Sequence, residues 1–412
     1  MMKWIKIASR NVWRNKRRSL VTIMAIAMGF AAVSLFKGYT HNTFKGLRQI
    51  AIQGEGLGHL TIYKDGWLEK GKTDPDNYMF SKGETTKVIQ LVEKDEDVIL
   101  ATPQINISGL VSDGRTSTIF MASGVIPKDD KTLRGTWATY RPVKGEGLQD
   151  NKIYGVEMAA GLAKHFNFKP GSDGVVMGTT LDGQMNALDI SISGIYDTGT
   201  AATNDKYMRV PLTFAQSLYD TEKADRIVVL LTDWKKTENA RQRLSAMLSE
   251  NGVNTEMRSW NELSLFYSKV KGMFDMIFMF IFSIVFIIVI MSVINTMGMA
   301  VLERTREIGT LRAIGLKRRG VSLLFAIEGG ILGFLGSLVG VAINIIAWAI
   351  IKVIGPSYIP PGISTPVPLI VNLVPQSMLI YLLFLIFLSL VAAIIPARRA
   401  AKQNVVDALG HV

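Results

Sequence analysis

The sequence predicts a membrane α-helical protein with four transmembrane helices and a large α+β extracytoplasmic domain between helices one and two. Three observations predict this fold: four long segments are almost free of charge, the basic residues gather in short segments beside them, and one long polar segment mixes strand and helix patterns. With 48% hydrophobic and 19% charged residues, the chain of 412 residues is too apolar to be disordered. It contains no cysteine, which excludes a disulfide scaffold and a thiolate nucleophile.

Four apolar segments are the predicted membrane spans. They cover residues 20–36, 276–301, 321–351 and 378–395, and Glu328 is their only charged residue. A helix needs about 20 residues to cross the hydrocarbon core, so all four qualify, and the third must tilt or extend beyond it. The first segment could instead be a cleaved signal peptide, but its basic leader and its apolar run are both long, which favours an uncleaved anchor.

The basic residues predict the orientation of the chain. Residues 1–19, 302–320 and 396–412 together hold sixteen Lys and Arg but three acidic residues, whereas the connection 352–377 holds a single lysine. The positive-inside rule therefore places both termini and the 302–320 loop in the cytoplasm, and 37–272 and the short connection outside. Of the net charge of +12, the three predicted cytoplasmic segments carry +13 and the rest of the chain carries −1. The rest of the chain therefore has no basic surplus for binding nucleic acid.

Residues 3–18 have the pattern of an amphipathic helix lying on the membrane surface. Basic residues spaced three or four apart share one face, and Ile5, Ala8 and Val12 share the other. The predicted membrane-surface residues are Lys3, Trp4, Lys6, Arg10, Trp13, Arg14, Arg17 and Arg18. An alternative is that these basic residues only signal the orientation of the chain, and both interpretations fit the same sequence.

The most specific motif follows the second span and reads ERTREIGTLRAIGLKRR over residues 303–319. It resembles the signature loop of FtsX-like permeases, the membrane subunits of ABC transporters that include MacB-type and lipoprotein-releasing (LolC/LolE-type) systems. The start, ASRNVWRNKRRSL at 8–20, and the ending, PARRAA at 396–401, resemble the same family. The layout of one helix, a large external domain and three further helices is also similar.

The resemblance implies that the 303–318 loop docks on a cytoplasmic ABC ATPase dimer and passes its closure to the membrane helices. The residues it assigns to ATPase coupling are Glu303, Arg304, Arg306, Glu307, Ile308, Gly309, Leu311, Arg312, Ile314 and Gly315. An ordinary positive-inside loop would explain the arginines but not the glutamates and glycines.

The resemblance also implies further partners. These are a second permease subunit, identical or related, a periplasmic accessory or carrier protein, and the lipid bilayer. ATP and Mg would be held by the partner ATPase, so no cofactor, metal or catalytic site is expected in this chain.

Glycines in the third span predict close helix packing. The helix-packing residues are Gly329, Gly333, Gly336 and Gly340, which form two G-x-x-x-G pairs. Such pairs let two helix backbones approach closely, either inside one subunit or at a seam between subunits.

Glu328 lies inside the third span, where an ionisable residue is a functional candidate. Its depth of about 12 Å favours a structural role, because the side chain could pair with Arg318 or Arg319 or cap a neighbouring helix.

Phenylalanines in the second span recur every four residues, at Phe274, Phe278, Phe282 and Phe286. This stripe could line a path for lipophilic cargo, but such stripes more often face lipid or pack on a neighbouring helix.

The segment 37–272 mixes strands and helices. Strands are predicted at 60–63, 117–121, 188–193 and 226–231, a helix at 237–250 closed by Asn251-Gly252, and tight turns at Asp65-Gly66, Asp113-Gly114 and Asp182-Gly183. These patterns predict an α+β fold that could divide into two lobes. The stretch from Asp189 to Leu212 resembles the periplasmic domain of MacB-type and LolC/LolE-type permeases, and GHLTIY at 58–63 is similar to the lipoprotein-releasing side of the family.

One further motif is a chance match. GWLEKGKT at 66–73 fits the P-loop pattern G-x-x-x-x-G-K-[ST], but a P-loop lysine and hydroxyl must open a helix. Here Pro75 follows at once and disfavours helical geometry at the residue before it, and Glu69 would repel a phosphate. ATP hydrolysis is therefore expected on a partner.

The sequence gives no enzyme signature. The histidines His41, His59, His165 and His411 show no metal-ligand spacing, and no serine or carboxylate constellation is convincing. The expected function is that of a permease subunit in the bacterial inner membrane, acting by mechanotransmission on lipoprotein or other lipophilic envelope cargo. The alternatives are MacB-like efflux of peptides or drugs, and a non-transporting FtsX-like regulator of cell-wall hydrolases.

Overall fold

The computed structural model describes residues 2–135, 144–359, 362 and 366–402. The chain divides into two compact units, and each is described by itself. The membrane unit comprises residues 1–44, 271–357 and 368–412, and the α/β unit comprises residues 45–270 and 358–367.

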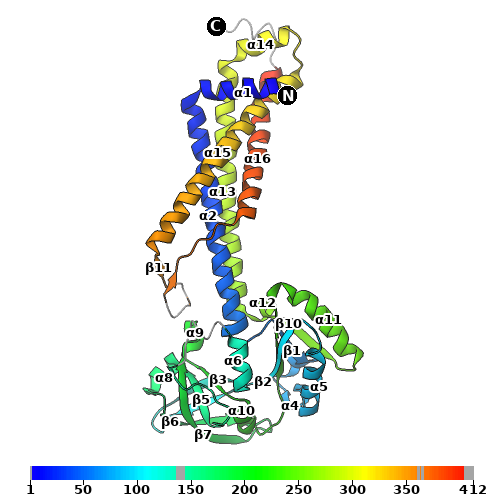
Figure 1. Cartoon of the computed structure of the whole chain (residues 1–412), viewed down its shortest axis with the longest axis vertical. Coiled ribbons are helices and arrows are strands. Elements are labelled where there is room, and N and C mark those ends of the chain that lie inside the picture. Colours follow the sequence, from blue (N-terminus) through cyan, green and yellow to red (C-terminus); the bar gives the residue numbers. More distant parts are fainter. Residues whose placement is uncertain (1, 136–143, 360–361, 363–365, 403–412) are drawn as a thin grey trace. The chain divides into compact units, whose positions relative to one another are not determined.

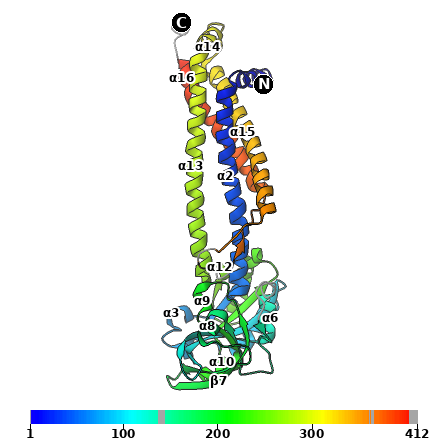
Figure 2. The ribbon, with the colours of Figure 1, turned by 90° about the vertical axis from the view of Figure 1, so that its left-hand side faces the viewer.

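Four long apolar helices form the core of the membrane unit, as the sequence predicts. They are α2 (Lys16–Gln49), α13 (Leu265–Glu303), α15 (Arg318–Ile354) and α16 (Pro375–Lys402), and each is long and apolar enough to cross a membrane (Figures 1 and 2). The helices are longer than the apolar runs because a helix propagates into polar residues until a breaker ends it. For α15 the breaker is Gly355, whose φ of 58° is left-handed.

The amphipathic helix at the start of the chain is shorter than predicted. Helix α1 (Met2–Arg14) ends before Asn15, where the chain turns into α2. The Ser19 hydroxyl donates to the Val12 carbonyl at 2.9 Å, and the Ser19 N–H donates to the Asn15 carbonyl at 3.0 Å. Because Ala8 and Val12 are buried, the apolar face of α1 packs on the bundle, and the chain has to change direction before α2 enters it.

The predicted glycine pairs of α15 pack against helices of the same chain. A Cβ on Gly329 would lie 2.5 Å from the Ala393 Cβ of α16, and one on Gly340 would lie 2.7 Å from the Phe30 Cβ of α2. Gly329 and Gly333 face α16, whereas Gly336 and Gly340 face α2. The two pairs therefore bring α15 close to two different neighbours within one subunit.

The phenylalanine stripe of α13 also packs on its neighbours. The ring centroids of Phe274 and Phe278 lie 6.1 and 6.2 Å from that of Phe36 on α2. The Phe282 centroid lies 5.3 Å from that of Phe384 on α16. Phe286 keeps an exposed ring.

A ten-stranded sheet organises the described part of the α/β unit. The strand order is β10-β1-β9-β2-β3-β8-β5-β7-β4, with β6 paired to β2 and β7, and only the β3–β8 and β5–β7 pairs are parallel. The strands are β1 (Leu60–Lys64), β2 (Val98–Ser112), β3 (Ser117–Val125), β4 (Lys144–Gly145), β5 (Gly155–Ala159), β6 (Asp173–Thr179), β7 (Met185–Tyr196), β8 (Tyr207–Pro211), β9 (Arg226–Leu231) and β10 (Thr255–Ser259).

Short helices flank this sheet. They are the π-helix η1 (Ile50–Gly54), α3 (Trp67–Lys70), α4 (Pro75–Tyr78), α5 (Lys82–Val92), α6 (Pro127–Arg134), α8 (Ala160–Phe166), α9 (Ala201–Asn204), α10 (Leu212–Tyr219), the 3-10 helix η2 (Trp234–Lys236), α11 (Thr237–Glu250) and α12 (Trp260–Leu263). A separate two-stranded pairing joins β11 (Ser357–Tyr358) and β12 (Val367–Pro368).

Two of the apolar cores in the α/β unit correspond to its two lobes. One core includes residues of α5, α11, β1 and β9, and the other includes residues of α8, α10, β5 and β7. Strand β2 serves both, because Ala101 near its start belongs to the first core and Ile107 further along belongs to the second. The long strand therefore links the lobes.

The predicted elements of this segment lie close to the observed ones. The helix 237–250 and the strand 226–231 match α11 and β9, and the other three predicted strands lie within β1, β3 and β7. Asp113-Gly114 and Asp182-Gly183 join the hairpins β2–β3 and β6–β7. Asp65-Gly66 differs, because it leads into α3 instead of into a strand.

The segment that matches the P-loop pattern does not form a phosphate-binding loop. After Gly66, whose φ is 82°, helix α3 occupies the positions at which a P-loop stays open. A Cβ on Gly71 would lie 2.3 Å from the Trp67 ring, so the indole fills the space that a phosphate would need. The Thr73 hydroxyl donates to the Lys70 carbonyl at 2.9 Å.

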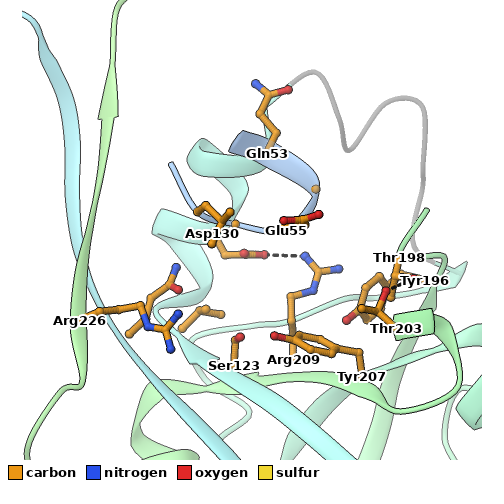
Figure 3. A pocket seen from close by; sticks show the side chains of 15 residues that line it. Gln53, Glu55, Ser123, Asp130, Tyr196, Thr198, Thr203, Tyr207, Arg209 and Arg226 are labelled. Atoms are coloured by element: carbon orange, nitrogen blue, oxygen red, sulfur yellow. Dashed lines mark hydrogen bonds and ion pairs between the residues drawn. The ribbon is translucent and has the colours of Figure 1, made fainter. Parts of the chain in front are cut away.

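A cluster of four buried charged residues in the α/β unit is not apparent from the sequence. Its members are Asp130 and Arg134 of α6, Glu157 of β5 and Arg209 of β8. Arg209 Nη1 donates to Asp130 Oδ2 at 3.1 Å, and Nη2 lies 2.8 Å from Glu157 Oε2. Arg209 lines a cavity of about 190 Å³ (Figure 3). Its guanidinium lies 3.9 Å from the centroid of the Tyr196 ring.

The ionised state of Arg209 is set by its neighbours. Burial alone would lower its pKa, but the carboxylates of Glu157 and Asp130 raise the pKa above its usual range. Because removing one member would leave an unpaired buried charge, the cluster fixes α6, β5 and β8 relative to one another.

We expect His59 to make the stability of the chain depend on pH. Its Nδ1 accepts the Leu231 N–H at 2.9 Å, and burial lowers the pKa of the imidazole to about 4. Since a histidine in the unfolded chain has a pKa of about 6.5, the unfolded state binds the proton first as the pH falls. The stabilisation is therefore present above pH 6.5 and decreases below it, by roughly 2 kcal/mol at pH 5.

Thermal unfolding of the purified full chain at pH 7.5 and pH 5.0 measures this effect. His59→Asn, whose Oδ1 can accept the same hydrogen bond, should show a smaller fall in melting temperature than the wild type. His165→Asn is the matched control, because His165 is exposed and should leave the pH profile unchanged. Identical profiles for wild type and His59→Asn would contradict the assignment.

Adjacent glycines of α15 should respond in opposite directions to alanine. At Gly329 the new methyl group would lie 2.5 Å from Ala393 and 2.7 Å from the Ser389 carbonyl, which should destabilise the chain by about 1–3 kcal/mol. At Gly330 the new methyl group would lie 3.8 Å from Leu390 Cδ1, which is ordinary van der Waals contact. The higher helix propensity of alanine should therefore stabilise the chain by up to about 1 kcal/mol. Melting temperatures of the two variants test this, and a shift of the same sign in both would refute it.

Candidate functional site

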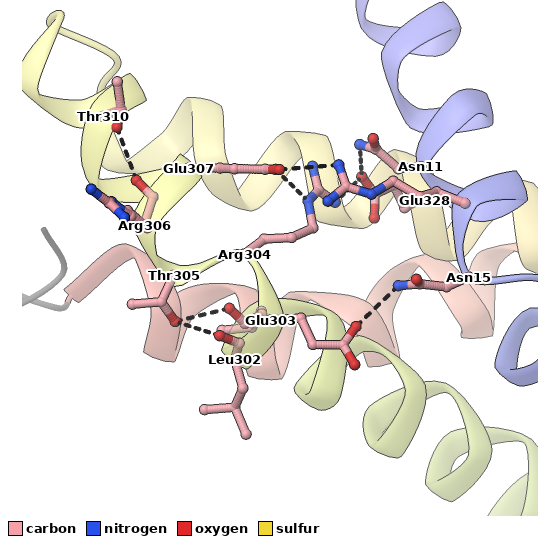
Figure 4. A network of polar contacts seen from close by, with 12 residues as sticks. Asn11, Asn15, Leu302, Glu303, Arg304, Thr305, Arg306, Glu307, Thr310 and Glu328 are labelled. Carbon is pink, nitrogen blue, oxygen red and sulfur yellow. Dashed lines mark hydrogen bonds and ion pairs between the residues drawn. The ribbon is translucent and has the colours of Figure 1, made fainter. Parts of the chain in front are cut away.

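The charged motif forms a short helix at one end of the membrane unit. Helix α13 ends at Glu303, Arg304 leaves helical geometry with φ −112° and ψ 16°, and α14 (Thr305–Ala313) begins. The Thr305 hydroxyl donates back to two carbonyls in the last turn of α13, at 3.0 Å each. These bonds tie the start of α14 to the end of the membrane helix (Figure 4).

A glycine ends α14 and returns the chain to α15. Gly315 has a φ of 102°, a conformation in which other residues are strained. The Leu316 N–H donates to the Leu311 carbonyl, and the Gly315 N–H donates to the Arg312 carbonyl, both at 3.0 Å. This pairing is a Schellman motif, which satisfies the last carbonyls of α14.

Arg304 is the centre of a polar network beneath α14. Its Nη1 donates to Glu328 Oε1 at 2.9 Å, and its Nε donates to Glu307 Oε2 at 3.1 Å. The same Glu328 oxygen accepts from Asn11 Nδ2 at 2.6 Å, and Glu328 is only 2% exposed. The Arg304 guanidinium also lies over the Phe325 ring, 5.5 Å from its centroid. Arg304 therefore links α14 to α15 and, through Glu328, to α1 (Figure 4).

Two exposed ion pairs add to the link between the α13–α14 junction and the start of the chain. Arg14 Nη1 lies 3.1 Å from Glu307 Oε1, and Arg18 Nη1 lies 2.5 Å from Glu303 Oε1. Asn15 Nδ2 donates to Glu303 Oε2 at 3.2 Å. Exposed pairs of this kind are each worth less than about 1 kcal/mol, so the buried Arg304–Glu328 pair is the stronger constraint.

The electrostatics of this network favour the charged forms of Arg304 and Glu307. Burial would raise the pKa of Glu307, but hydrogen bonds from Arg304 and Arg14 hold that pKa below its usual value. Burial would likewise lower the pKa of Arg304, but the Glu328 carboxylate raises it.

Helix α14 presents a different set of side chains on its outer surface. Ile314, which directly follows α14, is 80% exposed, Leu311 is 41% exposed, and Arg306, five residues before Leu311, is exposed as well. We call Arg306, Leu311 and Ile314 the outer face of α14. Exposed apolar side chains and an exposed arginine on one short segment are typical of a surface that binds a protein partner.

The structure gathers the predicted coupling residues in one segment and divides them by position. Ile308 and Gly309 are buried against the bundle, and Gly315 shapes the turn. Glu303, Arg304 and Glu307 are engaged in the network within the chain, and Arg306, Leu311 and Ile314 form the outer face. Arg312 lies in the last turn of α14.

The predicted partners of Glu328 are wrong. Its carboxylate binds Arg304 and Asn11, not Arg318 or Arg319. Arg319 precedes Glu328 by nine residues, about 13 Å along the helix axis, whereas the α13–α14 junction and α1 cross directly over the carboxylate. Sequence spacing along one helix could not reveal partners that come from two other helices.

The predicted membrane-surface residues, which lie in α1 and at the start of α2, also divide. Lys6, Arg10, Trp13 and Arg17 are exposed, and Arg14 and Arg18 have the carboxylate partners described above. The side chains of Lys3 and Trp4 lie outside the described residues. Two of the basic residues, Arg14 and Arg18, therefore connect helices.

Two sequence families match this chain. Residues 279–405 match the FtsX-like permease C-terminal family, and residues 19–247 match the MacB-like periplasmic core domain, which alone covers more than half of the chain.

Relatives with both parts are similar over almost the whole chain. The macrolide export ATP-binding/permease protein MacB of Chromobacterium violaceum is 24% identical over 98% of this chain, which spans 60% of the length of that relative. The lipoprotein-releasing system transmembrane protein LolC of Neisseria meningitidis is 20% identical over 95% of this chain and 94% of its own length. Among solved structures, the periplasmic region of MacB from Actinobacillus actinomycetemcomitans covers 51% of this chain and 92% of its own, with 14% identity and a TM-score of 0.36.

We expect Glu328→Gln to destabilise the membrane unit by about 2–4 kcal/mol. The substitution removes the buried charge that balances Arg304, whose side chain is 11% exposed. Glu303→Gln is the matched control, because its partner Arg18 remains in contact with water and the cost should stay below about 1 kcal/mol. The unfolding free energy in mixed micelles distinguishes them, and equal losses would show that the buried pair is not the stronger constraint.

Proposed function

This chain belongs to the MacB-like and FtsX-like family of ABC transporter permeases, and from that premise we propose that it passes the closure of a partner ATPase to the membrane helices through α14. The observation that carries the proposal is the two-sided construction of α14. Its outer face exposes Leu311 and Ile314, and its inner side is fastened to α15 by Arg304. A short helix built in this way can be pushed from outside and move its attached helices as one body.

The charge distribution supports an orientation for this mechanism. The basic residues around α1, α14 and the end of α16 favour the cytoplasmic side, so we infer that both termini and α14 face the cytoplasm of the bacterial inner membrane. The α/β unit then lies in the periplasm. ATP and Mg belong to the partner ATPase, and this chain acts as a permease subunit without a catalytic site of its own.

The polar network predicts which helices would follow a displacement of α14. Because Arg304 binds both Glu307 of α14 and Glu328 of α15, displacement of α14 moves α15. Because Glu328 also binds Asn11, and Glu307 also binds Arg14, α1 follows. Helix α15 packs through its glycines on α2 and α16, so three membrane helices receive the movement.

The proposed cargo is a lipoprotein or a similar lipophilic molecule taken from the outer leaflet of that membrane. Its support is the lipoprotein-releasing relative, which this chain matches over nearly the full length of both. MacB-like efflux from the periplasm is the second candidate, supported by the match of residues 19–247 to the MacB-like periplasmic core domain. Either mechanism would use a second permease subunit, since four helices are few for a complete transport path, and a periplasmic accessory or carrier protein.

The outer face of α14 provides the test. Replacing Leu311 and Ile314 together by serine should abolish co-purification of the ABC ATPase that accompanies the wild-type chain, because it removes the apolar contact and leaves the network intact. Ile119→Ser is the matched control, since Ile119 of β3 is 63% exposed in the α/β unit and should not affect ATPase binding. Retained ATPase binding and cargo-stimulated ATP turnover in the double variant would refute coupling through this face.

Mass spectrometry of the same nucleotide-free preparation addresses the cargo. Enrichment of acylated proteins over unmodified peptides and small molecules is the expected result, and enrichment of unmodified peptides or drug-like molecules would support efflux instead.

A further inference from the structure

Four further basic residues of the membrane unit line a groove between the start of α15 and the end of α16. The groove has a volume of about 620 Å³. Its described lining consists of Arg318, Arg319, Ser322, Leu323 and Ala326 from α15 and Leu390, Ile394, Arg398, Ala401 and Lys402 from α16. We call it the α15–α16 groove.

The cations of this groove differ from those of the network under α14. Arg14, Arg18 and Arg304 each contact a carboxylate, as described above. The four groove cations, Arg318, Arg319, Arg398 and Lys402, have no carboxylate within ion-pair distance among the described residues, and none of the described residues that line the groove is acidic. The groove therefore holds four positive charges that the described part of the chain does not balance.

The lining changes from charged to apolar along the helix axes. On α16 the residues recur every four positions, from Lys402 and Arg398 at the helix end to Ile394 and Leu390 further in, so they share one face. On α15 the sequence runs in the same spatial direction, from Arg319 at the helix start to Leu323 one turn in. Arg398 and Leu390 are about 12 Å apart along the axis, close to the distance from a phospholipid phosphate to the upper part of its acyl chains.

We propose that the α15–α16 groove binds an anionic glycerophospholipid of the leaflet on the α14 side. The phosphate and any second anionic group would contact the four cations, and one acyl chain would lie along Leu323, Ile394 and Leu390. Basic pockets between membrane helices suit such headgroups, because each Lys or Arg near the membrane surface attracts the anionic lipid. The acyl chain remains in the hydrocarbon region of the bilayer when the lipid binds. This inference rests on the proposed function in one respect: the proposed orientation of the chain makes this leaflet the cytoplasmic one.

The composition of the groove favours a lipid over a protein partner. Leu323 is exposed although it lies inside a membrane-spanning helix, so its natural neighbour is hydrocarbon. A soluble protein docked on the outer face of α14 would reach the helix ends but not the apolar lining one or two turns further in. A bound lipid would bridge α15 and α16 where Gly329 and Gly333 hold them together, and would stabilise the end that α14 moves.

Native mass spectrometry of the purified full chain tests the proposal directly. The chain is titrated with phosphatidylglycerol or with phosphatidylethanolamine of the same acyl chains, and we expect tighter binding of phosphatidylglycerol. The groove variant replaces four cations by glutamine: Arg318, Arg319, Arg398 and Lys402. We expect its affinity for phosphatidylglycerol to fall by at least about tenfold.

A charge-matched variant controls for general attraction. Lys72, Lys94, Lys128 and Lys169 are exposed cations of the α/β unit and do not line the groove, so their joint replacement by glutamine removes the same charge elsewhere. We expect this variant to bind phosphatidylglycerol like the wild type. Equal losses in both variants would show diffuse attraction and overturn the site.

Two competitors separate the other occupants. Displacement of phosphatidylglycerol by soluble glycerol 3-phosphate would show a phosphate site without an acyl subsite, and displacement by the partner ATPase would show a protein contact. Either result would overturn the lipid assignment. None of these outcomes depends on ATPase coupling through Leu311 and Ile314, so the two proposals can fail separately.

A second measurement does not depend on the folding of a fourfold variant. Because the sequence has no cysteine, Ser322→Cys carries a single bimane label in the groove. In vesicles that contain a small fraction of brominated lipid, brominated phosphatidylglycerol should quench this label more than brominated phosphatidylethanolamine at the same mole fraction. Equal quenching by the two lipids would contradict selective binding.

Discussion

A carboxylate inside a membrane helix needs a partner, because leaving a charge buried without one costs several kcal/mol. Glu328 meets this requirement with Arg304 and Asn11, which come from opposite parts of the chain. The pairing fixes three elements at once: the end of α13 with α14, the start of α15, and α1. The path proposed for mechanical coupling follows from this one electrostatic requirement, since none of these elements can move far without separating the pair.

The basic residues at this end of the membrane unit therefore have more than one role. Some contact carboxylates and join helices, and their exposed pairs are individually weak. Others surround the α15–α16 groove without a carboxylate among the described residues. The positive-inside rule counts both kinds equally, because orientation depends on the number of cations near the membrane and not on what each cation touches. Only their contacts separate a residue that links helices from one available to a lipid.

The α/β unit applies the same electrostatic rule in a different setting. Its two apolar cores share strand β2, and a buried group of two arginines and two carboxylates connects α6 with β5 and β8. Such a group adds little net stability compared with an apolar core, but it strongly penalises any arrangement that separates its members. That penalty makes the geometry of the lobe around Arg209 specific.

The sequence by itself determined the membrane fold, the family and the position of the charged motif at residues 303–319. The length and apolar composition of the four uncharged segments are enough to indicate membrane-spanning helices. The motif at residues 303–319 is contiguous in the sequence, so recognising it needs no tertiary information either. Local patterns also located α11 and β9, whose hydrophobic periodicity and glycine stop lie within a few residues. The tertiary structure alone decided the partners of Glu328, the helices that face each glycine pair and the buried charges around Arg209. These depend on side chains up to 317 residues apart, as Asn11 and Glu328 are, and the pattern within one helix or strand contains no information about which distant residue will pack against it.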